Sequence, residues 1–362
     1  MALYDKALVK TDNLPIKHTG DIHSGKVRSV YWLTDEDNKS LCSRYGLENE
    51  ELAVMVISDR ISAYECIWQS EGGLKGIPGK GAALNAIAHY WFRRFEEEDL
   101  AGNHIVDVPH PLVWLVRKAR PVMVEAIARQ YITGSMWRGY EKGERDICGI
   151  KLPEGLKKNQ KLNELLITPS TKGIITGVEG IPEIDDVNIT RDQILANLDV
   201  FNFRSEEDVS TYEKLLTEGF NLISSELDKI GKVFVDTKFE FGFIGEGADT
   251  KMIYIDEIGT PDSSRYWDKN LYEKGEIRED SKEFFREMLQ ASVPDKDVLL
   301  NKSRMDERAA LADTFRLKDE QMMEVSRLYV GLAEEITGEK LPLSDSPKTE
   351  IVEALAELGL IK

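Results

Sequence analysis

The sequence predicts an α+β protein in which short strands precede longer helices. Apolar runs typical of strands occupy the N-terminal third, at residues 27–33, 52–57, 105–108, 113–116 and 122–128. One amphipathic helix interrupts these strands, because apolar residues recur at helical spacing from Leu84 to Phe95. A second helical pattern covers residues 206–230 and ends at Gly231. After Pro261 the pattern is again helical, near residues 281–291, 319–337 and 347–358.

The chain of 362 residues is strongly acidic. It has 47 Lys and Arg against 65 Asp and Glu, which gives a formal charge of −18. Such a chain repels extended polyanions, so we expect neither nucleic acid nor a membrane surface as a partner. The longest stretch without a charged side chain, Gly81–Phe92, is 12 residues long and too short to span a bilayer. The lack of a secretory leader and the three widely spaced cysteines favour a cytoplasmic location.

A predicted hairpin near residues 232–258 carries the most informative charges. Its strands, 232–243 and 252–258, flank a glycine-rich turn. Alternation places Asp236, Lys238 and Glu240 on one face, and the apolar side chains on the other face, namely Val233, Val235, Phe239, Phe241 and Phe243. A turn centred near Gly247 would put Asp256 opposite Lys238. Three carboxylates around one lysine suit Mg²⁺ and nucleotide phosphates. The alternative is a solvated charged face on an edge hairpin.

Two further segments are candidates for binding anions. In Arg129–Ser135 a strand ends, glycine permits close approach to the backbone, and Ser135 would cap a helix whose N-terminus can bind an anion. An ordinary N-cap beside a surface arginine explains the same residues. Around Lys26 the pattern GxxxxGK is present, but Val27 stands where a P-loop needs Ser or Thr. We therefore expect a Gly-Lys loop between strands that folds over phosphates, or else a plain hairpin turn.

Covalent catalysis by the protein is not predicted. The sequence has no Gly-x-Ser-x-Gly elbow, and its five histidines lack metal-binding spacing. Cys148 lies in a glycine-flanked loop without a local catalytic signature. The polar turn from Thr260 to Arg265 follows the acidic hairpin and brings Asp262 and an arginine close to it in sequence. These charges favour a site that binds and positions anionic substrates.

Several stretches together resemble the SAICAR synthetase family, which is the phosphoribosylaminoimidazole-succinocarboxamide synthase family of purine biosynthesis. They run in order along the chain, as Gly25–Arg28, Ser58–Tyr64, Val124–Ser135, Thr168–Lys172, Asp236–Gly242 and Asp256–Trp267. The resemblance implies an ATP-dependent carbon–nitrogen ligase that joins carboxyaminoimidazole ribonucleotide (CAIR) to L-aspartate and releases ADP and phosphate. The alternative is a small-molecule kinase of the same broad fold.

The family's fold is related to ATP-grasp and kinase-like enzymes. The resemblance implies a smaller N-terminal sheet domain, residues 1–122, that covers ATP. A larger α+β domain, residues 123–362, would carry the ATP, Mg²⁺ and substrate sites and end in a helical C-terminal extension. The nucleotide would lie between the two domains. The expected partners are therefore small molecules, and a homo-oligomer remains open.

Roles for single residues follow from the matching motifs. Lys26, Lys238 and Glu240 would bind ATP, and Glu240 and Asp256 would hold Mg²⁺. Lys238, Asp236 and Arg265 would be catalytic, and the ribonucleotide would be gripped by Arg129, Ser135 and Arg265, with Asp262 nearby. The chain departs from the family at Glu65, where an aspartate is usual, and after Lys172, where Gly173 begins a stretch without the usual acidic and histidine residues. The pattern assigns no function to the residues after about 294.

Overall fold

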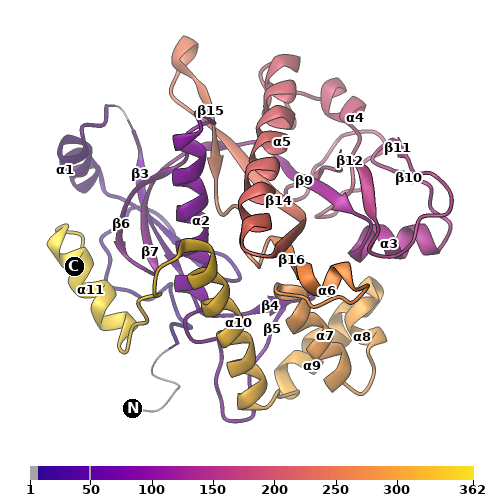
Figure 1. Cartoon of the computed structure of the whole chain (residues 1–362). Coiled ribbons are helices and arrows are strands. Elements are labelled where there is room, and N and C mark those ends of the chain that lie inside the picture. The colour runs from indigo at the N-terminus through magenta and orange to yellow at the C-terminus, as the bar shows by residue number, and fades with distance from the viewer. Residues whose placement is uncertain (1–6, 49) are drawn as a thin grey trace. The chain divides into compact units, whose positions relative to one another are not determined.

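The computed structural model describes residues 7–48 and 50–362, which fold into two compact units (Figure 1). The first unit contains the described residues up to His89, together with Ile105–Lys118 and Arg278–Lys362. The second unit contains Tyr90–His104 and Ala119–Ile277. Helix α2 (Lys80–Glu97) contributes its first half to one unit and its second half to the other. Both units combine helices with antiparallel strands, which confirms the predicted α+β class.

The first unit is built on a five-stranded antiparallel sheet. Its order is β1-β2-β3-β7-β6, with bounds β1 His23–Ser24, β2 Arg28–Trp32, β3 Leu52–Ile57, β7 Val113–Arg117 and β6 Ile105–His110. Strand β3 is central and has five of its six residues buried, which explains its unbroken apolar run LAVMVI. A two-stranded hairpin of β4 (Ser62–Ala63) and β5 (Cys66–Ile67) follows β3 in the chain. The strands predicted here are confirmed within a few residues.

Helix α1 (Asp35–Tyr45) was not predicted, because its sequence has no apolar stripe. Only Leu41 and Cys42 are buried, so the helix depends on its ends. The Thr34 hydroxyl accepts a hydrogen bond from the Asp37 amide, and acidic residues occupy the first turn, where they favour the helix dipole. At the other end Gly46 adopts a φ of 65°, a common helix stop.

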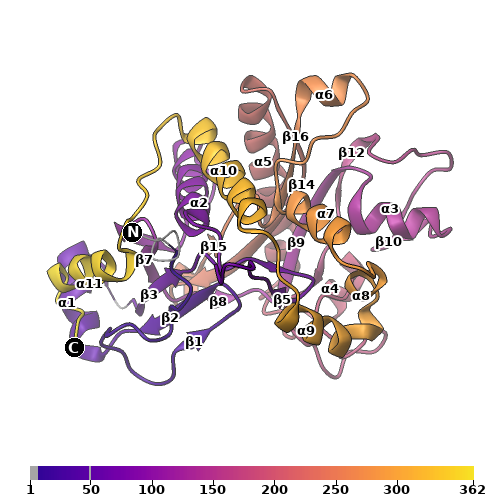
Figure 2. The ribbon, with the colours of Figure 1, turned by 90° about the horizontal axis from the view of Figure 1, so that it is seen from below.

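The C-terminal helices belong to the first unit. They are α7 (Lys282–Ser292), α8 (Asp297–Leu300), α9 (Met305–Thr314), α10 (Asp319–Thr337) and α11 (Pro347–Glu357). Figure 2 shows α7, α8 and α9 side by side, with α9 close to β5. The expected second domain, residues 123–362, therefore differs from the observed compact unit. The physical reason is that α10 packs on the start of α2, where the Ser326 hydroxyl donates to the Pro78 carbonyl and Lys80 lies over the Tyr329 ring.

The second unit is built around the long strand β14 (Lys232–Ile244). This strand pairs with four others, namely β8 (Arg120–Pro121), β9 (Val124–Tyr131), β15 (Lys251–Ile255) and β16 (Ser264–Asp268). Strand β9 pairs in addition with β12 (Lys161–Ile167) and β13 (Ser170–Thr171). Helix α5 (Glu206–Lys229) packs on β9 and β14, and the smaller elements are α3 (Gly134–Glu141), β10 (Asp146–Ile147), β11 (Ile150–Lys151), α4 (Arg191–Ala196) and α6 (Lys269–Glu273).

Two details of β14 correct the predicted hairpin. Glu240 pairs with Ile255, because six residues separate Ile244 from Lys251, so the register differs by one residue from the predicted pairing of Lys238 with Asp256. A bulge also falls at Val235, where the pairing with β16 shifts by one residue. Val235 packs against Tyr131 and Trp267, whereas Phe234 packs on Phe220 of α5. The predicted single apolar row from Val233 to Phe243 is therefore wrong.

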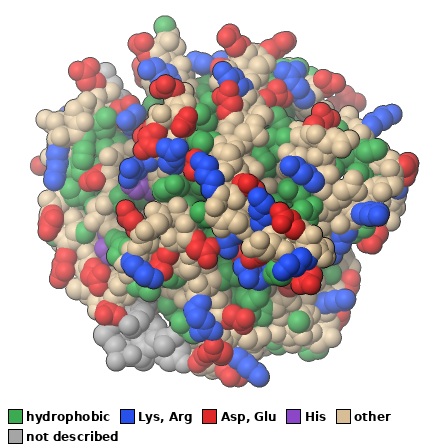
Figure 3. All heavy atoms as spheres, in the orientation of Figure 1, with side chains coloured by type: hydrophobic (Ala, Val, Ile, Leu, Met, Phe, Trp, Pro, Cys, Tyr) green, Lys and Arg blue, Asp and Glu red, His purple; other side chains and the backbone are tan. Residues whose placement is uncertain are grey.

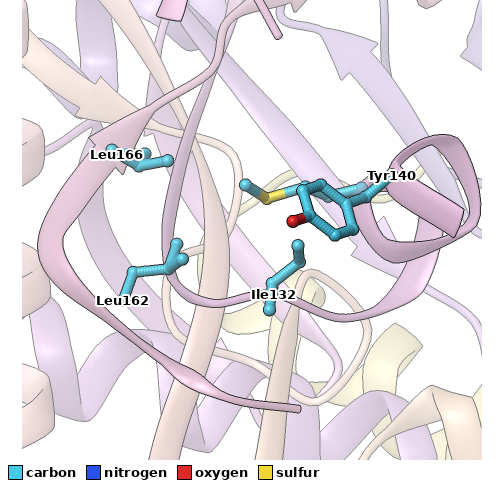
Figure 4. Close-up of a cluster of buried hydrophobic side chains, with 5 residues drawn as sticks. Ile132, Tyr140, Leu162 and Leu166 are labelled. Carbon is cyan, nitrogen blue, oxygen red and sulfur yellow. The ribbon is translucent and has the colours of Figure 1, made fainter. Parts of the chain in front are cut away.

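A buried apolar cluster fixes the short helix α3 beside β9. It consists of Ile132, Met136, Tyr140, Leu162 and Leu166, contributed by the end of β9, by α3 and by β12 (Figure 4). The Tyr140 hydroxyl donates to the Pro153 carbonyl, which also ties down the loop that follows α3. Packing of these side chains sets the position of the helix N-terminus relative to the end of β9.

The surface agrees with the chain's composition. On the face shown in Figure 3, acidic and basic side chains are interspersed. None of the helices in the described part of the chain has both the length and the apolar character that crossing a membrane requires.

Candidate active site

One face of the second unit's sheet collects charged side chains from β14 and β9. Asp236 pairs directly with Arg129, and Lys238 pairs with Ile127. The side chains of Lys238 and Glu240 contact each other, and Lys238 also reaches Glu125 on β9. The prediction that Asp236, Lys238 and Glu240 share a face is consistent with these pairings. The charges form two neighbouring clusters rather than one group around Lys238.

The arginine cluster consists of Arg129, Asp236 and Arg265. Arg129 Nη1 lies 3.3 Å from Asp236 Oδ2, and Arg265 Nη1 donates to the same oxygen. Arg129 Nε donates to the Thr168 hydroxyl at 2.9 Å. All three charged side chains are largely buried, and Asp236 accepts from both arginines. Burial lowers the pKa of Arg129, Asp236 and to a smaller extent Asp186 oppose this change, and Arg265 adds to it. Two neighbouring guanidinium groups are suited to bind an anionic ligand.

The N-terminus of α3 lies against the arginine cluster. Gly134 has a φ of 56°, and a Cβ atom at this position would come within 2.5 Å of Arg265 Nη2. Glycine is therefore required for the Arg265 guanidinium to lie against the backbone. The predicted cap is corrected, because the N-cap residue is Thr133 and Ser135 is the second residue of the helix. Ser135 is exposed at this helix end, where backbone N–H groups favour an anion.

The lysine cluster consists of Glu125, Lys172, Lys238 and Glu240. Lys238 Nζ lies 2.9 Å from Glu125 Oε1 and 2.8 Å from Glu240 Oε1, and Lys172 Nζ donates to Glu240 Oε2. Burial raises the pKa of Glu240, but the two lysines outweigh it and bring that pKa to about 2. Burial lowers the pKa of Lys238, but the two glutamates outweigh it and raise that pKa above its ordinary value. Lys238 and Glu240 are therefore both charged near neutral pH.

A half-buried thiol near the arginine cluster is held neutral. The Cys148 Sγ donates to the Pro169 carbonyl at 3.6 Å. Burial raises the pKa of Cys148 to about 11, although Arg129 opposes this effect. A neutral thiol is a poor nucleophile, so this geometry agrees with the absence of a covalent signature in the sequence.

Three remaining predicted residues lie outside the two clusters. Lys26 belongs to the first unit, where it is exposed in the turn between β1 and β2, and the Gly25 amide donates to the Arg28 carbonyl. Asp256 follows the last paired residue of β15 and adopts a φ of 61°, so it leaves the strand instead of facing Lys238. Asp262 lies in the loop between β15 and β16 and is partly buried.

Three residues that contact the predicted ones have no role predicted from the sequence, namely Glu125, Thr168 and Lys172. A fourth, Ser170, donates to Glu125 Oε2 at 3.3 Å. Alternation along β9 would have placed Glu125 on the same face as Arg129. Residues 168–172 reach the site only through the pairing of β13 with β9, which no local pattern reveals.

Comparisons with known proteins show the family of the chain. The family model for SAICAR synthetase matches residues 21–300. The phosphoribosylaminoimidazole-succinocarboxamide synthase of Shewanella piezotolerans is 59% identical over 359 residues, which cover 98% of both chains. The enzyme of that name from Psychromonas ingrahamii is 58% identical over the whole of both chains.

Solved structures support the same assignment. The SAICAR synthase of Saccharomyces cerevisiae, complexed with SAICAR, matches 90% of this chain and 96% of its own with a TM-score of 0.63 and 26% identity. A SAICAR synthetase in complex with ADP, at 19% identity and a TM-score of 0.55, covers 88% of this chain and 99% of its own and shares the fold. All the relatives named here are SAICAR synthases, which disfavours the kinase alternative. The chain therefore belongs to the SAICAR synthetase family.

Proposed function

We propose that the two charge clusters bind the substrates of an ATP-dependent condensation of CAIR with L-aspartate, which yields SAICAR, ADP and phosphate. Membership of the family makes the chain a ligase of purine biosynthesis. The observation that carries the assignment of the site is the arginine cluster, whose Arg265 guanidinium lies against Gly134 at the N-terminus of α3. It lies on the same sheet face as the lysine cluster. One face can thus hold two anionic groups.

The reaction requires the protein to position the substrates and to neutralise their negative charge. A carboxylate is a poor electrophile, so the CAIR carboxylate first takes the γ-phosphoryl group of ATP and becomes an acyl phosphate. The aspartate amine then attacks the acyl carbon, the C–N bond forms, and phosphate leaves. Neither step needs a nucleophilic side chain, and phosphoryl transfer depends mainly on alignment and on cations around the phosphoryl oxygens. The neutral thiol of Cys148 fits this scheme.

The clusters suggest a division of roles. Arg129 and Arg265, with the exposed end of α3 at Ser135, would grip the phosphate or carboxylate of the ribonucleotide. Asp236 accepts from both arginines, so its contribution would be to orient them. Lys238 would contact ATP phosphates during phosphoryl transfer, together with Lys26 from the first unit. Asp262, in the loop just before Arg265, would complete the ribonucleotide site.

A magnesium ion fits these residues only together with nucleotide. The described residues contain no group of three or more His, Cys, Asp or Glu that could hold a metal, and both oxygens of Glu240 contact lysines. Mg²⁺ commonly takes one or two protein carboxylates and completes its shell with phosphate and water. Glu240 and Asp256 would serve as these ligands once ATP phosphates draw the lysines away. When bound, the ion supplies charge neutralisation at the phosphoryl group.

The proposal is tested by substrate dependence. The protein is incubated with CAIR, L-aspartate, ATP and Mg²⁺, and ADP is measured while each component is left out in turn. We expect ADP only in the complete mixture, or slow ADP without aspartate if the acyl phosphate hydrolyses. ADP formation at the full rate without aspartate, with the γ-phosphate on a stable product, would instead indicate a kinase.

A further inference from the structure

We propose that residues 305–329, all of which follow the last residue matched by the family model, act as a clamp that holds the loop Ser58–Lys80, with Arg308 as a positioning residue. The inference gives a function to a segment that lies beyond residue 300. It concerns the first unit alone, because both segments belong to that unit. Its consequence for turnover rests on the function proposed above.

The two segments contact each other in the same order along the chain. Leu317 forms a parallel bridge with Ser70, in which the Leu317 amide donates to the Gln69 carbonyl at 3.1 Å and the Glu71 amide donates to the Leu317 carbonyl at 2.7 Å. On one side of this bridge the rings of Trp68 and Phe315 meet edge to face. On the other side the chain continues through three contacts, Gly72 with Asp319, Pro78 with Ser326, and Lys80 with Tyr329. The clamp therefore follows the loop from Trp68 to Lys80.

Arg308 connects the clamp to the β4–β5 turn. Its side chain is buried and donates to three backbone carbonyls, to Asn301 at 2.8 Å, to Val298 at 3.0 Å and to Tyr64 at 3.4 Å. Helix α7 adds a second tie, since Gln290 Nε2 donates to the Tyr64 hydroxyl at 2.6 Å. Figure 2 shows α9 beside β5, in agreement with these contacts.

The turn needs such support because its backbone is strained. Tyr64 and Glu65 are consecutive non-glycine residues in the left-handed region, with φ of 53° and 66°. A two-residue hairpin turn of this kind normally uses Asn and Gly, and a non-glycine residue in the left-handed region is strained. Such a conformation persists only when surrounding contacts enforce it. Arg308 and Gln290 supply those contacts.

The loop in turn supports the turn that carries Lys26. Ser58 donates through both its amide and its hydroxyl to the Val27 carbonyl at 2.8 Å, and Arg60 Nη2 donates to the Gly25 carbonyl at 3.3 Å. Lys26, Glu65 and Arg308 all act on the pKa of Cys66, so each of these charges lies in the neighbourhood of the Cys66 thiol. A displaced loop would therefore move the lysine proposed to contact ATP phosphates.

The test compares Arg308→Met with Arg304→Met in the full chain. Arg304 is the matched control, because its partners Asp295, Asp297 and Glu307 all lie in the C-terminal part. Hydrogen exchange is followed in peptides covering residues 58–72 and, as a reference, in β3. We expect Arg308→Met to speed exchange in residues 58–72 and not in β3, and to raise the KM for ATP about tenfold or more. Arg304→Met should change neither the exchange in residues 58–72 nor the KM for ATP.

The possible outcomes separate the clamp from its alternatives. If hydrogen exchange accelerates equally in β3, Arg308 only stabilises the unit as a whole. If exchange accelerates in residues 58–72 while the KM for ATP stays unchanged, Arg308 has no role in catalysis. Glu65→Asn should restore part of the ATP affinity in the Arg308→Met background, since Asn tolerates the left-handed region and the Tyr64 hydroxyl still accepts from Gln290. No recovery would contradict strain as the cause. If the unmodified chain makes no SAICAR, the proposed function fails, while the exchange experiment still decides the clamp.

Discussion

Replacing Glu240 by Gln tests the buried ion pairs at the site. The side chain keeps its volume but loses the charge that balances Lys172 and Lys238. Burial raises the pKa of Glu240, yet the lysines lower it from 4.5 to about 2. A fall of this size corresponds to about 3 kcal/mol of stability. We therefore expect Glu240→Gln to lower the free energy of unfolding by about 3 kcal/mol at pH 7.

The pH dependence of this loss is the sharper part of the prediction. The folded protein has the lower pKa, so the stabilisation is complete above pH 4.5 and is lost as the pH falls towards 2. The difference in unfolding free energy between the unmodified chain and the variant should thus shrink to roughly half or less by pH 3. Urea titrations at several pH values measure this difference. Other titrating groups cancel because both proteins contain them.

A surface pair supplies the control for this experiment. Glu154 lies 2.9 Å from Arg145 with its side chain 79% exposed, so Glu154→Gln should cost less than about 1 kcal/mol. A loss for Glu240→Gln as small as that of the control would refute the reasoning, as would a loss that does not change between pH 7 and pH 3. If the proposed function is correct, Glu240→Gln should also lose nearly all SAICAR formation.

Three further predictions concern the neighbouring groups. Arg265→Ala should raise the KM for the ribonucleotide about 10- to 100-fold, because a charged hydrogen bond to an anion is lost, and unchanged steady-state constants would exclude this residue from the site. Gly134→Ala should raise the same KM, since the new Cβ would meet the Arg265 guanidinium, whereas Gly155→Ala, at a φ of 80° with no atom within 4 Å, shares only the backbone strain. A KM shift of equal size in both alanine variants would contradict the collision. Cys148→Ala should leave kcat unchanged. The rate of Cys148 alkylation should increase with pH up to about pH 11, near the pKa of its thiol. Rapid alkylation at pH 7 would contradict the raised pKa.

The sequence predicted those parts of the fold that local periodicity controls. The bounds expected for α10, residues 319–337, are those observed, because its apolar stripe is regular and Gly338 ends it with a φ of 72°. Helix α1 was missed because its stability comes from Thr34 and Gly46 at its ends. The hairpin register was wrong by one residue, since register depends on the number of loop residues, and the glycine-rich turn has no unique centre in the sequence.

In the site, too, local periodicity predicts some features, whereas others depend on the topology. Alternation placed Asp236, Lys238 and Glu240 on one face, but the partners of these residues depend on which strands pair. Nothing near Glu240 in the sequence indicates Lys172, which reaches it from 68 residues away. The packing of the C-terminal helices on the loop before α2 is equally non-local. Periodicity gives the direction of a side chain, whereas the identity of its neighbour is a property of the topology.

The carboxylates of the site explain how a chain with a charge of −18 can bind anionic substrates. In the lysine cluster two glutamates contact two lysines, and in the arginine cluster one aspartate contacts two arginines, so each of these four cations has a carboxylate partner. Buried cations without partners would be costly, and the carboxylates remove that cost while they fix the orientation of each cation. A phosphate can then take over a cation from a carboxylate without the cation having to be ordered again. The acidic residues at the site therefore prepare it for anions.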